Sequence, residues 1–314
     1  MTRRRILVPI DLDAQSDSAL DFARNIATRL NAMISCMYVI EEQKLRTNNP
    51  KNREAKLEQR RDVEIRLSEK VNSILSEAKT PFELIITHGK VHEKILEKSM
   101  DLNAQLIIMS RSNTGDIGKK RIGSITKHII TKSQIPVITI GRYKIVNREN
   151  IIVPLDVFKP IGSQVIFAID TAMLLGAAVT VISVIEKEML SLRPVYLKRL
   201  KEIRKLLRDI KIDCNSHLLT TRNTVPEEIL SFSRKLDSAM ILLMTSNEIK
   251  ANGSSIGSVA KGIIAESELP VQCINPNCKS RNLSDKSGNF YKLDSWSWYS
   301  LKDHHIKNQQ ELET

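Results

Sequence analysis

The strongest constraint on the fold of this 314-residue chain is that it repeats itself. Residues 5–42 align without a gap with residues 150–187, and both segments contain a Val-Pro-x-Asp sequence after a short apolar run. The ends of the two units match as well, since residues 122–137 align with residues 256–271. Similarity that keeps its order over two whole units predicts two copies of one domain, and the length suits two domains of ~100–200 residues.

Within each copy, short apolar runs alternate with stretches of helical periodicity. Short apolar runs are typical of strands buried on both faces, whereas apolar residues three and four apart indicate amphipathic helices. In the first copy the predicted strands are 5–10, 32–40, 82–87, 104–110 and 136–140, and the predicted helices are 16–30, 50–79, 91–100 and 123–131. In the second copy the predicted strands lie near Ile151, Ala178, Lys211, Ala239 and Val271.

Strands that are apolar on both faces and separated by helices predict a parallel sheet covered on both sides. The predicted fold class is therefore α/β, with two tandem, doubly wound domains of five strands each. Any ligand is expected at the carboxyl ends of the strands. The predicted boundaries are 1–145 and 146–275 for the two domains and 276–314 for a polar tail, which contains Trp296 and Trp298. This tail is either a loose extension or a docking segment for a protein partner or a second subunit.

Composition excludes several classes of protein. Hydrophobic residues make up 41% of the chain and charged residues 27%, values that rule out global disorder. No run of ~18 apolar residues is present, so we expect no membrane-spanning helix and no membrane partner. The short basic start, followed by an apolar run that Asp11 ends, does not resemble a signal peptide. By elimination we expect a cytoplasmic protein.

The net charge of +12 suggests nucleic acid as a partner. The basic stretches are not interleaved with aromatic residues and match no nucleic-acid motif, so specific nucleic-acid binding is not expected. The four cysteines (Cys36, Cys214, Cys273 and Cys278) are too few for a disulfide framework and wrongly spaced for zinc, and we interpret them as buried, inert thiols. No metal site is expected at His88 and His92 either, because no third ligand accompanies them.

Three motifs together resemble the universal stress protein family. The first strand of each copy ends in Val-Pro-x-Asp, the second ends in Val-Ile-Glu, and a late apolar strand is followed by Gly-Ser, a helix and Pro-Val. The likeness covers about residues 3–275 and leaves only the tail outside. The resemblance implies Rossmann-like domains of the adenine nucleotide α-hydrolase type, which often pair through their last strand. The two copies are then expected to form an intramolecular pseudo-dimer, and a further homodimer stays open.

The nucleotide-binding branch of this family carries the signature Gly-x2-Gly-x9-Gly-(Ser/Thr). Glycines let the main chain approach phosphates closely, and the final Gly-Ser opens a helix whose free N–H groups attract anions. In the first copy Ser110 and Asn113 occupy the first two glycine positions, at the family spacing from Gly123 and Ser124. The resemblance therefore implies ATP as a ligand of the first copy, bound weakly because two glycines are replaced.

In the second copy Thr245 and Glu248 are taken to replace these glycines, ahead of Gly257 and Ser258, in a loop that is one residue shorter. A carboxylate at Glu248 would repel the phosphates. We therefore expect no nucleotide in the second copy, and neither copy is expected to need a metal.

Further binding positions follow from the resemblance residue by residue. Asp11 would lie near the ribose and Val39 would line the adenine pocket, with Asp156 and Val184 as their equivalents in the second copy. The residues alone leave structural roles open: Asp11 and Asp156 also suit helix caps or loop-tying carboxylates, and each Gly-Ser pair suits a tight turn with the serine as helix cap. The candidate cofactor-binding residues are Asp11, Val39, Ser110, Asn113, Gly123, Ser124, Asp156, Val184, Gly257 and Ser258.

No catalytic residue is predicted. The chain has neither the Gly-x4-Gly-Lys-(Ser/Thr) loop of P-loop enzymes nor a Gly-x-Ser-x-Gly nucleophile elbow. Residues 11–16 contain no glycine, unlike the phosphate loop of α-hydrolase-type enzymes. The leading hypothesis is a non-enzymatic, cytoplasmic stress-response or signalling protein. The alternative is a scaffold that has lost nucleotide binding and acts through protein–protein contacts.

Overall fold

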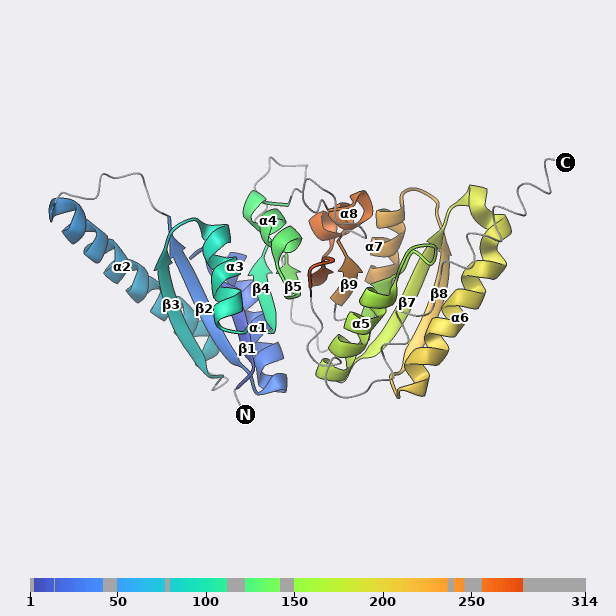
Figure 1. Cartoon of the computed structure of the whole chain (residues 1–314), viewed down its shortest axis with the longest axis horizontal. Coiled ribbons are helices and arrows are strands. Elements are labelled where there is room, and N and C mark those ends of the chain that lie inside the picture. The colour runs from blue at the N-terminus through green and yellow to red at the C-terminus, as the bar shows by residue number, and fades with distance from the viewer. Residues whose placement is uncertain are drawn as a thin grey trace.

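The computed structural model of the protein describes residues 3–13, 15–41, 50–76, 80–111, 122–141, 150–236, 240–245 and 256–278. The strands of the first copy are β1 (Arg5–Pro9), β2 (Met33–Ile40), β3 (Phe82–His88), β4 (Leu106–Ser110) and β5 (Val137–Ile140). Those of the second copy are β6 (Asn150–Pro154), β7 (Ala178–Ile185), β8 (Cys214–Thr220), β9 (Met240–Met244) and β10 (Val271–Ile274). Together they form one sheet in the order β3-β2-β1-β4-β5-β10-β9-β6-β7-β8 (Figure 1).

Helices follow the strands in the same order in both copies. The first domain, built on β1–β5, contains α1 (Gln15–Leu30), α2 (Pro50–Leu75), α3 (Val91–Asp101) and α4 (Ser124–Lys132). The second domain, built on β6–β10, contains α5 (Gly162–Leu175), the short 3-10 helix η1 (Lys187–Leu192), α6 (Arg193–Asp209), α7 (Val225–Lys235) and α8 (Ser258–Glu266). The predicted α/β fold class, with two doubly wound five-stranded units, is confirmed.

Two predicted boundaries were wrong. The third strand of the second domain begins at Cys214 and not near Lys211, because Lys211 leaves α6 with a left-handed φ of 67° and pairing with β7 starts only three residues later. In the first domain α2 ends at Leu75, whereas the sequence predicted a helix up to residue 79. The predicted domain boundary at residue 145 and most of the tail lie outside the described residues and stay predictions.

Side chains of the strands pack alternately into two cores, one on each face of the sheet. Ile6 and Val8 belong to the core that α1, α2, α5 and α6 cover, whereas Leu7 between them belongs to the core under α3, α4, α7 and α8. This is the period of two expected of a strand whose faces are both buried. Within the described residues, no helix combines the length and the apolar character needed to cross a lipid bilayer.

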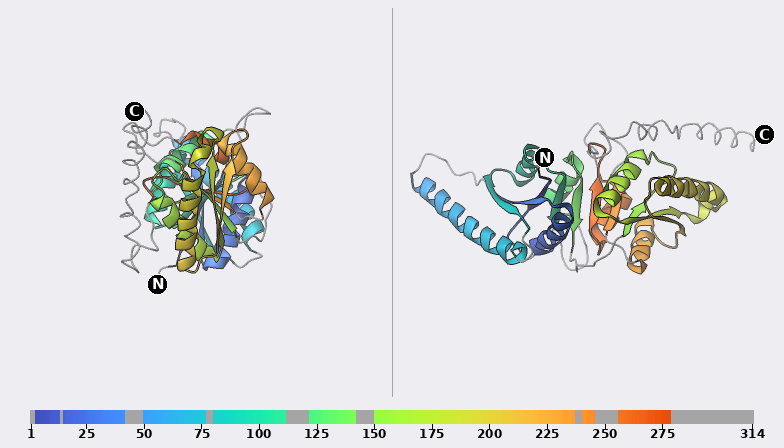
Figure 2. Two further views of the ribbon diagram at one scale, coloured as in Figure 1. Left: turned by 90° about the vertical axis from the view of Figure 1, so that its right-hand side faces the viewer. Right: turned by 90° about the horizontal axis from the view of Figure 1, so that it is seen from below.

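Among its described side chains, α2 packs against the sheet through its C-terminal half. Its buried side chains recur every four residues, at Val63, Leu67, Val71 and Leu75, while Ile65 is 59% exposed. The N-terminal half extends beyond the rest of the first domain (Figure 2). The corresponding helix of the second domain, α6, has 17 residues against the 26 of α2.

The two domains join through their last strands. β5 and β10 run antiparallel, with Ile138 opposite Gln272, and every other neighbouring pair in the sheet is parallel. Both side chains are buried, and the amide of Gln272 donates to Thr171 of α5 at 3.0 Å. The resemblance implied a pseudo-dimer paired in this way, and the structure has it. Because β5 and β10 are antiparallel, the carboxyl ends of the two sets of strands face opposite ends of the sheet.

Candidate functional site

The predicted site residues of the first domain lie at the carboxyl ends of three adjacent strands. Asp11 follows β1, Val39 lies near the end of β2, Ser110 ends β4, and Gly123 with Ser124 begins α4. In the strand order β3-β2-β1-β4-β5, the chain adds strands on one side of β1 and then on the other, so the order of the strands reverses at β1. In doubly wound sheets the ligand crevice opens there, between the loops that leave the two central strands. Asn113 lies outside the described residues.

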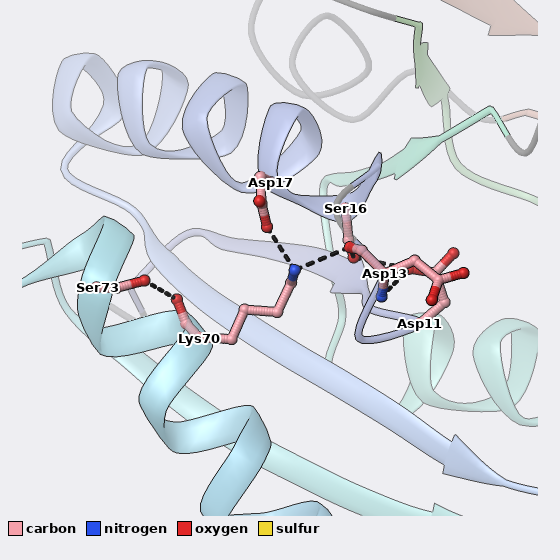
Figure 3. Close-up of polar contacts among 6 residues, drawn as sticks. All are labelled: Asp11, Asp13, Ser16, Asp17, Lys70 and Ser73. Atoms are coloured by element: carbon pink, nitrogen blue, oxygen red, sulfur yellow. Dashed lines mark hydrogen bonds and ion pairs between the residues drawn. The ribbon is translucent and has the colours of Figure 1, made fainter.

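The loop after β1 is held by its own aspartate. The Oδ1 atom of Asp11 accepts hydrogen bonds from the main-chain N–H of Asp13 at 3.2 Å and from Ser16 Oγ at 2.7 Å. Lys70 of α2 fixes the same loop from the outside, donating to the Asp13 carbonyl at 2.8 Å and pairing with Asp17 at 2.5 Å (Figure 3). Asp11 ties the loop although it is exposed to solvent.

We expect Lys70→Met to loosen this loop. The substitution keeps the apolar stem but removes the hydrogen bond to Asp13 and the ion pair with Asp17, and should lower the free energy of unfolding by about 1 kcal/mol. Arg66→Met is the matched control, because Arg66 lies on the same helix with its side chain 58% exposed. Chemical denaturation of both variants measures the difference, and equal stability would contradict the cross-linking role of Lys70.

The corresponding loop of the second domain is packed differently. Asp156 Oδ1 again accepts a main-chain N–H, that of Phe158, at 3.1 Å. Arg199 of α6 is buried, donates to the carbonyl of Val157 and stacks 5.2 Å from the centre of the Phe158 ring. Tyr196 meets the same ring edge-on at 5.0 Å. An aromatic cluster therefore occupies the second domain where the first has an aspartate–lysine network, while Val184 lies in β7 as predicted.

The helices at the two candidate anion sites begin at glycine. Gly123 and Gly257 are the N-cap residues of α4 and α8, and neither helix has a side-chain cap. The alternative role of Ser124 and Ser258 as helix caps was wrong, because these serines are already the first helical residues. By contrast α7 carries a complete capping box formed by Thr224 and Glu227. The first-turn N–H groups of α4 and α8 thus lack the side-chain acceptor that α7 has.

A tight turn does not explain these glycines. Gly123 has φ −58° and ψ 152°, and Gly257 has φ −60° and ψ 154°, angles open to any residue. A methyl group built on Gly257 would meet only the carbonyl oxygen of Thr245 at 3.6 Å, an ordinary contact. The dihedral angles at both positions, and the space around Gly257, therefore do not require glycine.

The strand register also corrects the assignment of the second signature. Ser110 lies opposite Ile140 in β5, and Met244 lies opposite Ile274 in β10. The residues that follow are equivalent as well, since Arg111 N–H donates to the Ile140 carbonyl and Thr245 N–H to the Ile274 carbonyl. Met244, and not Thr245, is thus the counterpart of Ser110.

This register makes the two loops equal in length. Met244 stands as far before Gly257 as Ser110 stands before Gly123, so the predicted one-residue shortening was wrong. The second glycine position then falls on Asn247, which matches Asn113 of the first copy, and Glu248 moves off it. Asn247 and Glu248 themselves lie outside the described residues.

Two histidines meet on the surface of the first domain. His92 of α3 and His128 of α4 have ring centres 4.1 Å apart, a contact that helix packing creates and sequence spacing did not reveal. Desolvation, His92 and Lys132 lower the pKa of His128, while Glu93 opposes them. Among the residues that the structure describes, no three histidines, cysteines or carboxylates come together as a metal site.

The prediction of buried thiols is confirmed for three of the four cysteines. All four cysteines are free; Cys36, Cys214 and Cys273 are buried and Cys278 is half-buried. Burial raises the pKa of each thiol, to about 11 for Cys214 and Cys278. Reactive cysteines have lowered pKa values, so these four are structural.

Comparison with known proteins supports both the fold and the family. The model of the universal stress protein family matches residues 2–141. A universal stress protein from Archaeoglobus fulgidus superposes with a TM-score of 0.67 and 20% identity, over 88% of this chain and 97% of that chain. A putative universal stress protein from Pseudomonas aeruginosa gives a TM-score of 0.59 and 17% identity, over 88% and 94%. No match was found among curated proteins.

The solved structures are too distant in sequence to show more than the fold, but they cover both domains. The family match covers the first domain, and the internal repeat extends its motifs to the second. The first domain of this chain is therefore a universal stress protein domain, joined in tandem to a second domain that repeats its fold.

Proposed function

We propose that the protein is a non-enzymatic, cytoplasmic stress-response or signalling protein whose first domain binds an adenine nucleotide such as ATP weakly. The observation that carries this proposal is the start of α4. Its N-cap residue is a glycine with ordinary dihedral angles that provides no side-chain cap, and the helix follows β4, the strand next to β1 in the sheet. Phosphate groups suit such a helix start, which offers free N–H groups and the positive end of the helix dipole.

The residues of the first domain have distinct roles in this proposal. Gly123 and Ser124 contact the phosphates, Asp11 contacts the ribose, and Val39 lines the adenine pocket with its main chain. Ser110 and Asn113, in place of the family's glycines, limit how closely the main chain approaches the phosphates. The binding is therefore weak, without a metal site of the protein's own.

The second domain is proposed not to bind the nucleotide. Gly257 and Ser258 repeat the helix start, but Met244 stands where the first domain has the small Ser110. Met244 is partly buried and packs against the core on the α5–α6 face, the face from which the loop of Asp156 and Phe158 is held. In this proposal the longer side chain at this position would leave less room for phosphates than Ser110 does.

Calorimetry with ATP and magnesium tests the proposal on the full chain. We expect saturable binding to the unaltered protein, at least a tenfold loss of affinity in Gly123→Val, because a branched side chain blocks the approach to the helix N–H groups, and no loss in Gly257→Val. Valine adopts the dihedral angles of both glycines without strain, so both variants should fold. Equal loss in both variants would overturn the assignment of the site to the first domain.

Absence of binding up to millimolar ATP would overturn nucleotide binding altogether. The alternative function would then stand: a scaffold that has lost the nucleotide and acts through protein–protein contacts, with the tail as its docking segment. The replaced glycines at Ser110 and Met244 are the observation that favours it.

A further inference from the structure

Equivalent positions of the two domains carry different residues beside the domain interface. Arg111 and Thr245 follow the equivalent strands β4 and β9, as their hydrogen bonds to Ile140 and Ile274 show. Gly141 and Asn275 follow the last strands β5 and β10. The first domain thus presents an arginine–glycine pair where the second presents a threonine–asparagine pair.

Each domain caps the end of a helix in the other. The guanidinium of Arg111 donates to the carbonyls of Ile264 and Ser267, at the C-terminus of α8. In the opposite direction, Asn275 Nδ2 donates at 2.8 Å to the carbonyl of Ile130 and at 2.8 Å to that of Ser133, at the C-terminus of α4. These are the same two carbonyls in each repeat, reached from the partner domain by two different donors.

The choice of donor fits the charge of each helix. The last turn of α4 contains Lys132, whereas the last turn of α8 contains no basic residue. A helix C-terminus favours a cation, so α8 receives the charged Arg111 and α4 the neutral Asn275. Burial lowers the pKa of Arg111 to about 10, which leaves it charged at neutral pH.

Each donor also fits its companion residue. A methyl group built on Gly141 would overlap Nη2 of Arg111 and lie 3.1 Å from its Cζ. A side chain at position 141 would therefore have to displace the guanidinium of Arg111 from its place in this structure. In the second domain the hydroxyl of Thr245 donates a hydrogen bond to the Ile274 carbonyl of its own domain at 3.2 Å. Asn275, and not Thr245, therefore makes the contact with the other domain.

The two cross-domain caps differ in which strand end they connect to the other domain. Arg111 directly follows Ser110, the last residue of the strand that leads to the proposed ligand site. Asn275 follows the last strand, and Thr245, the residue after Met244, bonds only within its own domain in the described structure. The strand end at the first ligand site is thus bonded to the other domain, and its counterpart at the second is not.

We propose that Arg111 is a positioning residue that makes ligand binding by the first domain depend on the second domain. This inference rests on the proposed function. Through the two carbonyls at the end of α8, Arg111 holds the end of β4 and hence Ser110 in place. The second domain, which is proposed not to bind the nucleotide, then stabilises the binding site of the first domain.

A swap of the two residue pairs tests this role. Arg111→Thr leaves the end of α8 uncapped, and Gly141→Asn collides with Arg111, so each alone should lower the melting temperature by about 5 °C. The double variant installs the threonine–asparagine pair in the first domain, and Asn at 141 can then cap α8 as Asn275 caps α4. We expect it to recover most of the melting temperature. A double variant no more stable than Arg111→Thr would overturn the exchange of caps.

The affinity for ATP separates positioning from domain pairing. We expect the dissociation constant for ATP to be about five times higher in Arg111→Thr and in the double variant alike. Both variants lack the arginine that connects the end of β4, next to Ser110, to the C-terminus of α8. Recovery of the affinity together with the melting temperature would show that Arg111 acts only through pairing and would overturn the positioning role. If the unaltered protein binds no ATP, the proposed function fails and this role with it, while the melting temperatures still decide the exchange of caps.

Discussion

Replacing Ile138 with aspartate is expected to break the ten-stranded sheet at its centre and to lower the free energy of unfolding by more than about 4 kcal/mol. Ile138 is 1% exposed and lies opposite Gln272, so a carboxylate there would be buried without a cationic partner. Denaturant unfolding followed by circular dichroism measures the loss, and small-angle scattering detects the separation of the domains.

Ile65→Asp is the control for this experiment. Ile65 is an isoleucine of α2 that is 59% exposed, so the same change in chemistry should alter the stability by less than about 0.5 kcal/mol. Similar effects of the two substitutions would show that the contact between β5 and β10 contributes little to the stability of the protein.

Above pH 9 the protein is expected to lose stability steeply because of its buried thiols. The pKa of Cys214 and of Cys278 is raised to about 11, and those of Cys36 and Cys273 are raised further. Unfolded thiols release their protons from about pH 8.5, so between that pH and 11 the unfolded chain binds fewer protons than the folded one. Stability therefore falls as the pH rises, by at most about 1.4 kcal/mol per pH unit for each thiol.

The double variant Cys214→Ala/Cys278→Ala isolates this effect. Lysines and tyrosines titrate in the same range in both proteins, so the difference in slope between the unaltered protein and the variant reports the two thiols. We expect the unaltered protein to be steeper by up to about 3 kcal/mol per pH unit between pH 9 and 10. Parallel curves of unfolding free energy against pH would contradict the raised thiol pKa values.

The elements of the fold could be read from the sequence because their signals are local. The run Leu106–Met109 is apolar throughout, and the helix over 16–30 shows a clear apolar stripe, so both elements were predicted within a residue or two. Because the domain is repeated, each element could be predicted from two segments of the sequence. The start of β8 was harder to predict, because it depends on the left-handed dihedral angle of Lys211, and the residue type lysine does not indicate such an angle.

The details of the site were harder to predict because they depend on register and on distant contacts. Thr245 and Ser110 are both small and polar, so aligning them by residue type displaced the second signature by one residue. The pairing of Met244 with Ile274 corrects this alignment. The caps at Gly123 and Gly257 depend on where each helix begins. The partners of Arg111 lie 153 and 156 residues away along the chain, so that no local pattern could identify them.

The pairing of β5 with β10 also has a consequence for how the protein responds to its own abundance. Two separate subunits that join through such strands dissociate on dilution, because their association depends on concentration. Here the two halves are covalently joined, so each meets its partner at an effective concentration fixed by the connection and not by expression. The same pairing occupies the strand edge that would otherwise recruit a second copy. The protein should therefore keep its paired form when it is scarce, and any larger assembly has to use another surface.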